Sequence, residues 1–147
     1  MPIEDHRFRA DVIWDGKTGG NVRIGRSRKI KLDMPIEFGG MGRYPCPDEL
    51  FLSGIAGCLL TTFLHFKKKL KVAVEGLQIS VNGTIGAGPQ GYRISRLKVT
   101  ISAKAKNENQ DGVRRCIMLA KEYCHITRTL EKAIPIEIKE SVNVTGK

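Results

Sequence analysis

The chain has 147 residues, and its 25 Lys and Arg against 15 Asp and Glu give a formal net charge of +10. This length fits one domain with a core of its own and is short for two. The positive charge suits nucleic acid, an anionic membrane or acidic partners, and it selects none of them. The first residues, MPIEDHRFRA, contain no apolar signal region, so we expect a cytoplasmic protein.

Residues 6–34 carry the first strand signals. The segment HRFRADVIW alternates loosely up to the turn signal Asp15–Gly16, and two further extended segments follow before Pro35. We predict an antiparallel strand meander over residues 6–34, with Trp14 as its one large anchor. The glycine-rich segment 37–46 is predicted to be a loop. No Gly-Lys-Ser/Thr follows it, so its glycines favour a role in backbone geometry over nucleotide binding.

The next element is a central helix, predicted over residues 47–70. Pro47 suits the first helical position, and no charged residue lies between Glu49 and Lys67. Apolar side chains surround the helix axis, which is typical of a helix buried on all sides. The run is at the short limit for a membrane span and contains polar residues and two glycines, so we interpret it as a core helix and expect no membrane insertion.

The remaining predicted elements are, in chain order, a hairpin over 72–105, a helix over 109–123, a turn over 127–133 and a strand over 134–144. Pro135 favours an edge position for the last strand. The order of strands, long helix, hairpin, helix and strand predicts a single α+β domain over residues 1–147. Its antiparallel sheets are expected to surround the long buried helix.

The chain contains four cysteines, Cys46, Cys58, Cys116 and Cys124. In a chain without an export signal we expect them to be reduced thiols, and the Cys and His spacings match no zinc motif. Cys116 and Cys124 would stand roughly 12 Å apart on one helix, too far for a disulfide. Cys58 lies near the middle of the central helix among small residues, where another backbone could come close. A buried cysteine usually serves as a small apolar side chain, and we leave Cys46 and Cys116 with that role.

Several short motifs follow one another at characteristic spacings. They are Trp14-Asp15-Gly16, Gly19-Gly20, Glu37-Phe38-Gly39-Gly40, Pro47-Asp48-Glu49-Leu50, Ala56-Gly57-Cys58 and, after the second helix, Cys124. Each motif is weak alone, but their order and spacing are specific. Together they resemble, over nearly the whole chain, the superfamily of osmotically inducible protein C and organic hydroperoxide resistance proteins (OsmC/Ohr).

The resemblance implies an OsmC-like intertwined homodimer with two long helices at its centre and a role in the oxidative stress response. It also implies a thiol-dependent peroxidase that uses no cofactor and reduces organic hydroperoxides. Transferred to this chain, Cys58 would attack the peroxide and become a sulfenic acid. Cys124 would then form a disulfide with Cys58, and an external dithiol would reduce that disulfide.

Attack requires a thiolate, whereas burial raises the pKa of a thiol, so a cation must approach Cys58. The family uses an arginine of the N-terminal meander, oriented by a glutamate. Here Asp48 stands in the place of that glutamate, and Gly20–Asn21 stand near the expected arginine. Arg23 and Arg26 are the candidate replacements.

We expect the peroxide to bind an apolar pocket lined by Phe51, Ile55 and Leu59, with Phe63 as a further candidate. His125, next to the second cysteine, has two interpretations. It is either a proton donor and acceptor near neutral pH or a partly exposed packing residue.

Two alternatives stand beside the peroxidase. One is an OsmC-like protein without efficient peroxidase activity, because a fold does not determine function. The other is a basic nucleic-acid or anion-binding protein, suggested by the positive clusters at 23–31 and 67–71. No aromatic platform accompanies these clusters, and they also suit a helix end and a wet strand face, so we do not expect nucleic acid as a partner.

Overall fold

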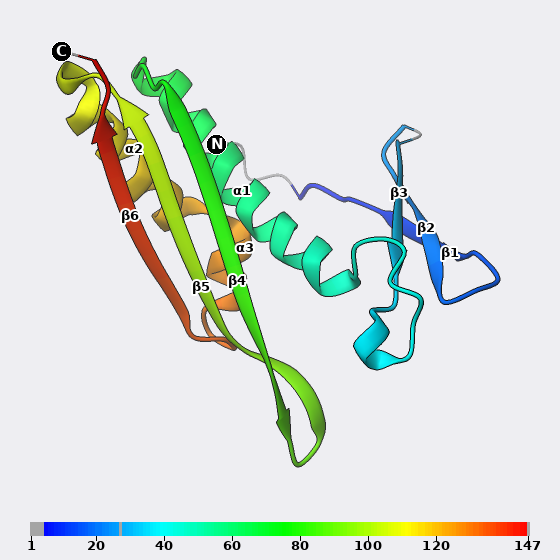
Figure 1. The fold of residues 1–147 in the computed structure, drawn as a ribbon. Coiled ribbons are helices and arrows are strands. Elements are labelled where there is room, and N and C mark those ends of the chain that lie inside the picture. Colours follow the sequence, from blue (N-terminus) through cyan, green and yellow to red (C-terminus); the bar gives the residue numbers. More distant parts are fainter. Residues whose placement is uncertain (1–4, 27, 147) are drawn as a thin grey trace. The chain divides into compact units, whose positions relative to one another are not determined.

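The computed structural model describes residues 5–26 and 28–146 (Figure 1). The chain divides into two compact units, residues 1–51 and 52–147, where the sequence predicts one domain. The division falls inside helix α1, which spans Pro47–Leu70. Each unit has its own sheet, and we describe the two units separately.

The N-terminal unit contains a three-stranded antiparallel sheet in the order β1-β2-β3. Its strands are β1 (Ala10–Trp14), β2 (Gly19–Ile24) and β3 (Arg28–Asp33), followed by the short 3₁₀ helix η1 (Ile36–Phe38). The prediction that Trp14 anchors this sheet is wrong for the single chain, because 73% of its surface is exposed. The indole N–H instead donates to the Lys17 carbonyl at 2.8 Å and so braces the turn between β1 and β2.

Helix α1 begins and ends as its charges predict. Asp48 and Glu49 occupy the first turn, and Lys67, Lys68 and Lys69 occupy the last, which complements the helix dipole at both ends. Glu49 also accepts a hydrogen bond from the Cys46 backbone N–H at 3.0 Å, closing one half of a capping box.

The buried residues of α1 form one stripe, whereas the sequence predicts burial on all sides. They are Ile55, Cys58, Leu59 and Phe63, at the spacing of one helical face. On other faces Thr61 and Leu64 are exposed, because no described element of the chain covers them. By length and composition alone α1 could cross a membrane, a test that core helices of soluble proteins also pass.

The C-terminal unit contains a sheet in the order β4-β5-β6. Strands β4 (Gly76–Gly88) and β5 (Gly91–Ala105) form a long antiparallel hairpin, and β6 (Ile136–Val144) pairs with β5. Every second residue of β5 from Leu97 to Ala105 is buried, so this central strand supplies much of the core. The β5–β6 pairing is parallel, which corrects the expectation of purely antiparallel sheets. Two helices between these strands return the chain to the same end of the sheet, as a parallel pair requires.

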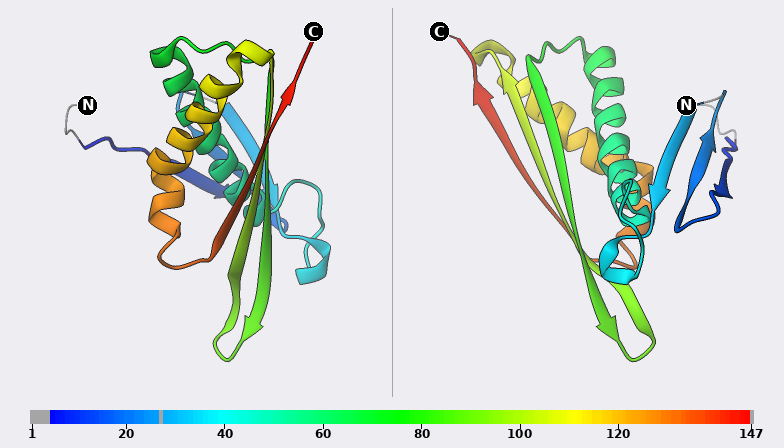
Figure 2. Two further views of the ribbon diagram at one scale, coloured as in Figure 1. Left: turned by 90° about the vertical axis from the view of Figure 1, so that its left-hand side faces the viewer. Right: turned by 45° about the vertical axis from the view of Figure 1, so that its right-hand side comes forward.

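Those connecting helices are α2 (Gln110–Tyr123) and α3 (His125–Leu130), and a 3₁₀ turn, η2 (Asn107–Asn109), precedes them. Figure 2 shows α2 and α3 on the same face of the β4–β6 sheet as the C-terminal part of α1. The turn predicted over residues 127–133 is therefore partly a short helix. Its first turn is held by Cys124, whose carbonyl accepts the Arg128 N–H at 3.0 Å and the Thr127 hydroxyl at 3.1 Å.

Candidate active site

Two cysteines that are distant in sequence lie side by side in the C-terminal unit. Cys58 belongs to the buried stripe of α1 and is 8% exposed, whereas Cys124 joins α2 to α3 and is fully buried. The Cys124 side chain is close enough to the Cys58 thiol to raise its pKa. Both are free thiols. The structure therefore brings together the pair that the sequence resemblance singles out.

The imidazole of His125 contacts the same sulfur. Its Nδ1 lies 3.7 Å and its Nε2 3.9 Å from Cys58 Sγ. His125 is the first residue of α3 and is exposed, and it lines a surface hollow of about 330 Å³ with Arg128, Thr129, Glu131 and Lys132. The ring thus has the buried thiol on one side and a solvent-filled hollow beside it.

The surroundings of Cys58 favour the neutral thiol. Burial is the largest cause and raises the pKa of Cys58, and the neighbouring Cys124 side chain raises it further. Two groups act in the opposite direction, because the Ile126 backbone N–H and the Thr62 side chain both stabilise a thiolate through hydrogen bonds. The net direction is upward, so this thiol needs help to ionise.

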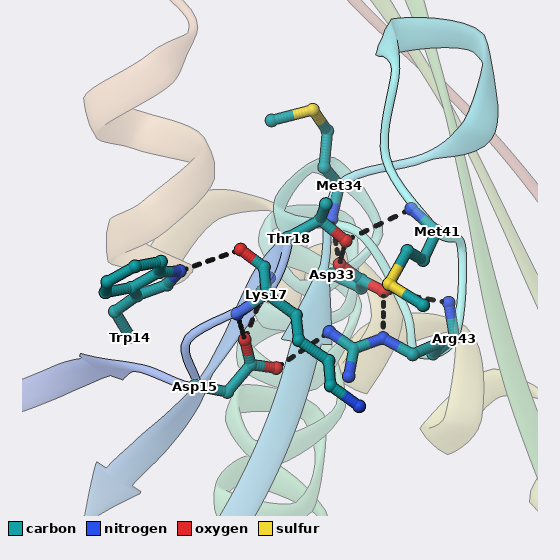
Figure 3. Close-up of polar contacts among 9 residues, drawn as sticks. Trp14, Asp15, Lys17, Thr18, Asp33, Met34, Met41 and Arg43 are labelled. Carbon is teal, nitrogen blue, oxygen red and sulfur yellow. Dashed lines mark hydrogen bonds and ion pairs between the residues drawn. The ribbon is translucent and has the colours of Figure 1, made fainter.

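A second polar cluster lies in the N-terminal unit, around Arg43 (Figure 3). The Arg43 guanidinium pairs with two carboxylates, through Nε with Asp33 Oδ2 at 2.8 Å and through one terminal nitrogen with Asp15 Oδ2 at 2.7 Å. Asp33 is fully buried and also accepts hydrogen bonds from the Thr18 hydroxyl at 2.6 Å and the Met34 N–H at 2.9 Å. This cluster was not predicted from the sequence.

The Arg43 cluster holds its groups in their charged forms. The pKa of Asp33 is lowered well below its ordinary range, first by the hydrogen bond from Arg43 and then by those from Thr18 and the backbone. The pKa of Asp15 is also lowered, mainly by the Lys17 N–H, and the two carboxylates raise the pKa of Arg43. The motif Trp14-Asp15-Gly16 is one signal for this cluster, since it places an acid at the end of β1.

The other predicted site residues take different positions. Arg23 is exposed on β2, Asp48 is half-buried in the first turn of α1, and Phe51 is half-buried at the end of the N-terminal unit. Their supporting roles stay predictions. Ile55 and Leu59 have no exposed surface, and Phe63 is 1% exposed. These three belong to the core of the C-terminal unit, so their role in a substrate pocket also stays a prediction. Among residues 5–26 and 28–146, no cluster of three or more Cys, His, Asp or Glu could hold a metal ion.

Comparison with known proteins agrees with this fold. Residues 40–139 match the family described as OsmC-like protein. YmaD of Bacillus subtilis, an uncharacterized protein, is 24% identical over 150 residues, covering 99% of this chain and 100% of YmaD. The organic hydroperoxide resistance protein-like 2 of Staphylococcus saprophyticus is 28% identical over 141 residues, covering 92% of this chain and 96% of that protein.

A solved structure is also similar to this chain in its fold. The organic hydroperoxide resistance protein OsmC of Legionella pneumophila superposes with a TM-score of 0.69 at 25% identity, covering 95% of this chain and 98% of that one. The mixed α and β architecture with its long helix is therefore that of the OsmC fold. The chain belongs to the OsmC-like protein family, within the OsmC/Ohr superfamily.

Proposed function

We propose that the chain is a thiol-dependent peroxidase that reduces organic hydroperoxides. One observation carries the proposal: Cys58 and Cys124 are free thiols and close neighbours, brought together by α1 and the α2–α3 junction. Supporting it, two of its relatives are named for organic hydroperoxide resistance.

The reaction has two steps. The Cys58 thiolate attacks the terminal oxygen of R–O–O–H, so an S–O bond forms, the O–O bond breaks and the alkoxide leaves as an alcohol once protonated. Cys58 is then a sulfenic acid. The Cys124 thiol attacks its sulfur, a disulfide forms and water leaves. An external dithiol returns both residues to thiols and is itself oxidised to a disulfide.

The exposure of the two cysteines supports the assignment of Cys58 as the attacking thiol and Cys124 as the second one. Cys58 retains 8% exposure, so a peroxide can reach it with a small movement, whereas Cys124 has no exposed surface. The partly exposed sulfur is the better attacking group. The buried thiol is held beside it, ready to capture the sulfenic acid before a second peroxide oxidises it further.

We also propose a cytoplasmic homodimer that acts in the oxidative stress response. Each unit leaves large apolar side chains exposed, including Phe8 at 94%, Ile36 at 71% and Met118 at 59%. Apolar surface of this kind is typical of residues that another subunit covers. The molar mass measured by light scattering during gel filtration tests the dimer directly, and a purely monomeric protein at micromolar concentration would contradict it.

Stopped-flow mixing with cumene hydroperoxide, followed by mass spectrometry of trapped cysteines, tests the peroxidase. We expect rapid oxidation of the parent protein, loss of that phase in Cys58→Ser, and a persistent Cys58 sulfenic acid in Cys124→Ser. Cys116→Ser is the matched control, because Cys116 is also buried on a helix of this unit. A parent protein that reacts no faster than Cys58→Ser would favour an OsmC-like protein without efficient peroxidase activity.

A further inference from the structure

We infer that His125 is a catalytic residue, which accepts the proton of the Cys58 thiol and delivers it to the departing alkoxide. The inference rests on the proposed peroxidase and adds a residue to it. Its basis is the contact of the imidazole with Cys58 Sγ, at 3.7 Å from Nδ1 and 3.9 Å from Nε2.

Cys58 needs a group that removes its proton. Burial and the neighbouring Cys124 both disfavour a Cys58 thiolate, yet the thiolate is the attacking species. Besides Cys124, the groups that reach this side chain are the Ile126 N–H, the Thr62 side chain and the His125 ring. A backbone amide and a hydroxyl stabilise a thiolate without taking its proton near neutral pH. Of these three groups, the imidazole is the one that can exchange a proton under those conditions.

The ring lies within reach of the sulfur. Because Cys58 Sγ is nearly equidistant from the two ring nitrogens, the lone pair of neither nitrogen points directly at it, and a rotation of the exposed ring about its Cβ–Cγ bond would aim one accepting nitrogen at the thiol. The contact is long, as catalytic hydrogen bonds often are before substrate binds. At the backbone, the Thr129 hydroxyl donates to the His125 carbonyl at 2.7 Å, which holds the first turn of α3 and the residue that bears the ring.

The imidazole is accessible from the surface. His125 is exposed and lines the 330 Å³ hollow, whereas the sulfur is nearly buried. A peroxide that approaches from this hollow meets the ring beside the sulfur, where the alkoxide would be released. The charged side chains of the hollow are Arg128, Glu131 and Lys132. The Cys58 thiol faces the ring, and the Cys124 thiol is the neighbour of Cys58.

The proton balance closes without a further reactant. Neutral His125 takes the proton of Cys58 and becomes an imidazolium beside the thiolate. When sulfur attacks, the terminal peroxide oxygen keeps its hydrogen and becomes the sulfenic acid hydroxyl. The alkoxide then takes the proton from the imidazolium, so the products are an alcohol, a Cys58 sulfenic acid and a neutral imidazole.

Two measurements on His125→Asn and His125→Ala test the inference. The first is single-turnover oxidation by cumene hydroperoxide at pH 7. The second is iodoacetamide alkylation of Cys58 as a function of pH, read from its peptide by mass spectrometry, which requires the thiolate and no peroxide. His65→Asn is the matched control, since His65 is an exposed histidine of α1 whose ring meets that of Phe66 edge to face.

We expect both His125 variants to oxidise about 100-fold or more slowly at pH 7, the usual scale of general acid–base catalysis. Their alkylation midpoint should move to higher pH. Added imidazole should restore part of the rate in His125→Ala, because the ring position adjoins the hollow, and should leave the parent unchanged. A packing residue would show no such rescue.

Parent rates and an unshifted alkylation midpoint in folded His125 variants would overturn the inference and leave the peroxidase standing. A parent protein that fails to react with the peroxide would overturn the peroxidase itself. Circular dichroism establishes that each variant is folded. If one variant does not fold, the other carries the test.

Discussion

Arg43 and Asp33 meet twice in the N-terminal unit, because both the backbone N–H and the Nε–H of Arg43 donate to Asp33 Oδ2, at 3.0 Å and 2.8 Å. Thr18 and Met34 donate to the other carboxylate oxygen, Oδ1. A fully buried carboxylate is thereby satisfied on both oxygens, as a charge removed from water must be. This side chain adds to the backbone hydrogen bonds, from the Asp33 N–H to the Pro45 carbonyl and from the Gly42 N–H to the Met34 carbonyl, that attach the loop carrying Arg43 to the end of β3.

Replacing Asp33 with Asn is expected to destabilise the N-terminal unit and to remove part of its acid sensitivity. The amide turns an NH₂ group toward donors and leaves Arg43 without its charged partner. The native pKa of Asp33 lies below its ordinary value of 3.8, so its stabilisation is present above about pH 4 and is lost as the pH falls toward the native pKa. The parent should therefore lose more stability than Asp33→Asn between pH 5 and pH 2.

Urea unfolding followed by fluorescence of the single tryptophan, Trp14, measures this effect, because Trp14 lies in the N-terminal sheet. Asp11→Asn is the control, since the Asp11 side chain is exposed in an ion pair with Arg9. Equal acid sensitivity of the parent and Asp33→Asn would exclude Asp33 as a source of the pH dependence.

Arg43→Lys keeps the positive charge but should lose part of the hydrogen bonding in the cluster. The guanidinium reaches Asp33 through Nε and Asp15 through a terminal nitrogen, whereas an ammonium is a single point donor. We expect the urea midpoint of Arg43→Lys to fall clearly below that of the parent. Arg23→Lys, at an exposed position of β2, should change it little. Identical midpoints for Arg43→Lys and the parent would contradict a bridging role.

Gly40→Ala should cost about 1–3 kcal/mol, the range for forcing extra volume into packed structure. A Cβ at Gly40 would overlap the backbone carbonyl and Cβ of Met34, and a backbone cannot rotate away as a side chain can. Gly88→Ala is the comparison, since its nearest contact, with the Gly91 carbonyl oxygen at 3.7 Å, is ordinary. Chemical unfolding of both variants checks this. A loss of less than about 0.5 kcal/mol at Gly40 would show that the loop adapts.

Cys124→Ala should make Cys58 ionise at lower pH, because the Cys124 side chain is one of the causes that raise the pKa of Cys58. The alkylation midpoint of Cys58 should shift downward, with the rate at pH 7 rising accordingly. Cys116→Ala serves as the control. A midpoint that stays in place or moves upward in Cys124→Ala would exclude Cys124 as a cause of the raised pKa of Cys58.

Gly57→Ala distinguishes a single chain from an assembly. In the described part of the chain, nothing outside the helix's own backbone lies within 4 Å of a Cβ at this position, so alanine should stabilise α1 by about 0.5–1 kcal/mol. In the homodimer proposed above, a partner subunit that packs closely against Gly57 would clash with the added methyl group. The alanine would then destabilise the protein and weaken association of the subunits. Gel filtration with light scattering, together with thermal unfolding, reads both effects. Greater stability with an unchanged molar mass would exclude a close contact at Gly57.

The local pattern of the sequence predicted the elements that carry a clear period. The run without charges in α1 and the alternation of β5 are properties of single segments, and local propensity agreed with the final packing. The parallel pairing of β6 could not be read this way, because partner choice depends on long-range contacts. Helix α3 has six residues, too few for a periodic signal.

The same distinction between local pattern and long-range packing applies to the candidate site. The sequence identified Cys58 and Cys124 through family resemblance, and nothing in their local segments indicated that they touch. The contact of His125 with Cys58 joins residues 67 positions apart, so it depends on how α1 packs with the α2–α3 junction. The Arg43 cluster likewise needs a turn, a strand end and a loop to meet, and none of these carries a strong motif alone.

Helix α1 limits where the protein can be divided into fragments. The two units meet between Phe51 and Leu52, inside a continuous helix whose N-terminal acids lie in one unit and whose thiol lies in the other. Cutting the chain there would leave the C-terminal fragment with a helix lacking its proline start and its acidic first turn. The two units are therefore unsuited to separate expression, and exchange of parts with a relative should be made outside residues 47–70.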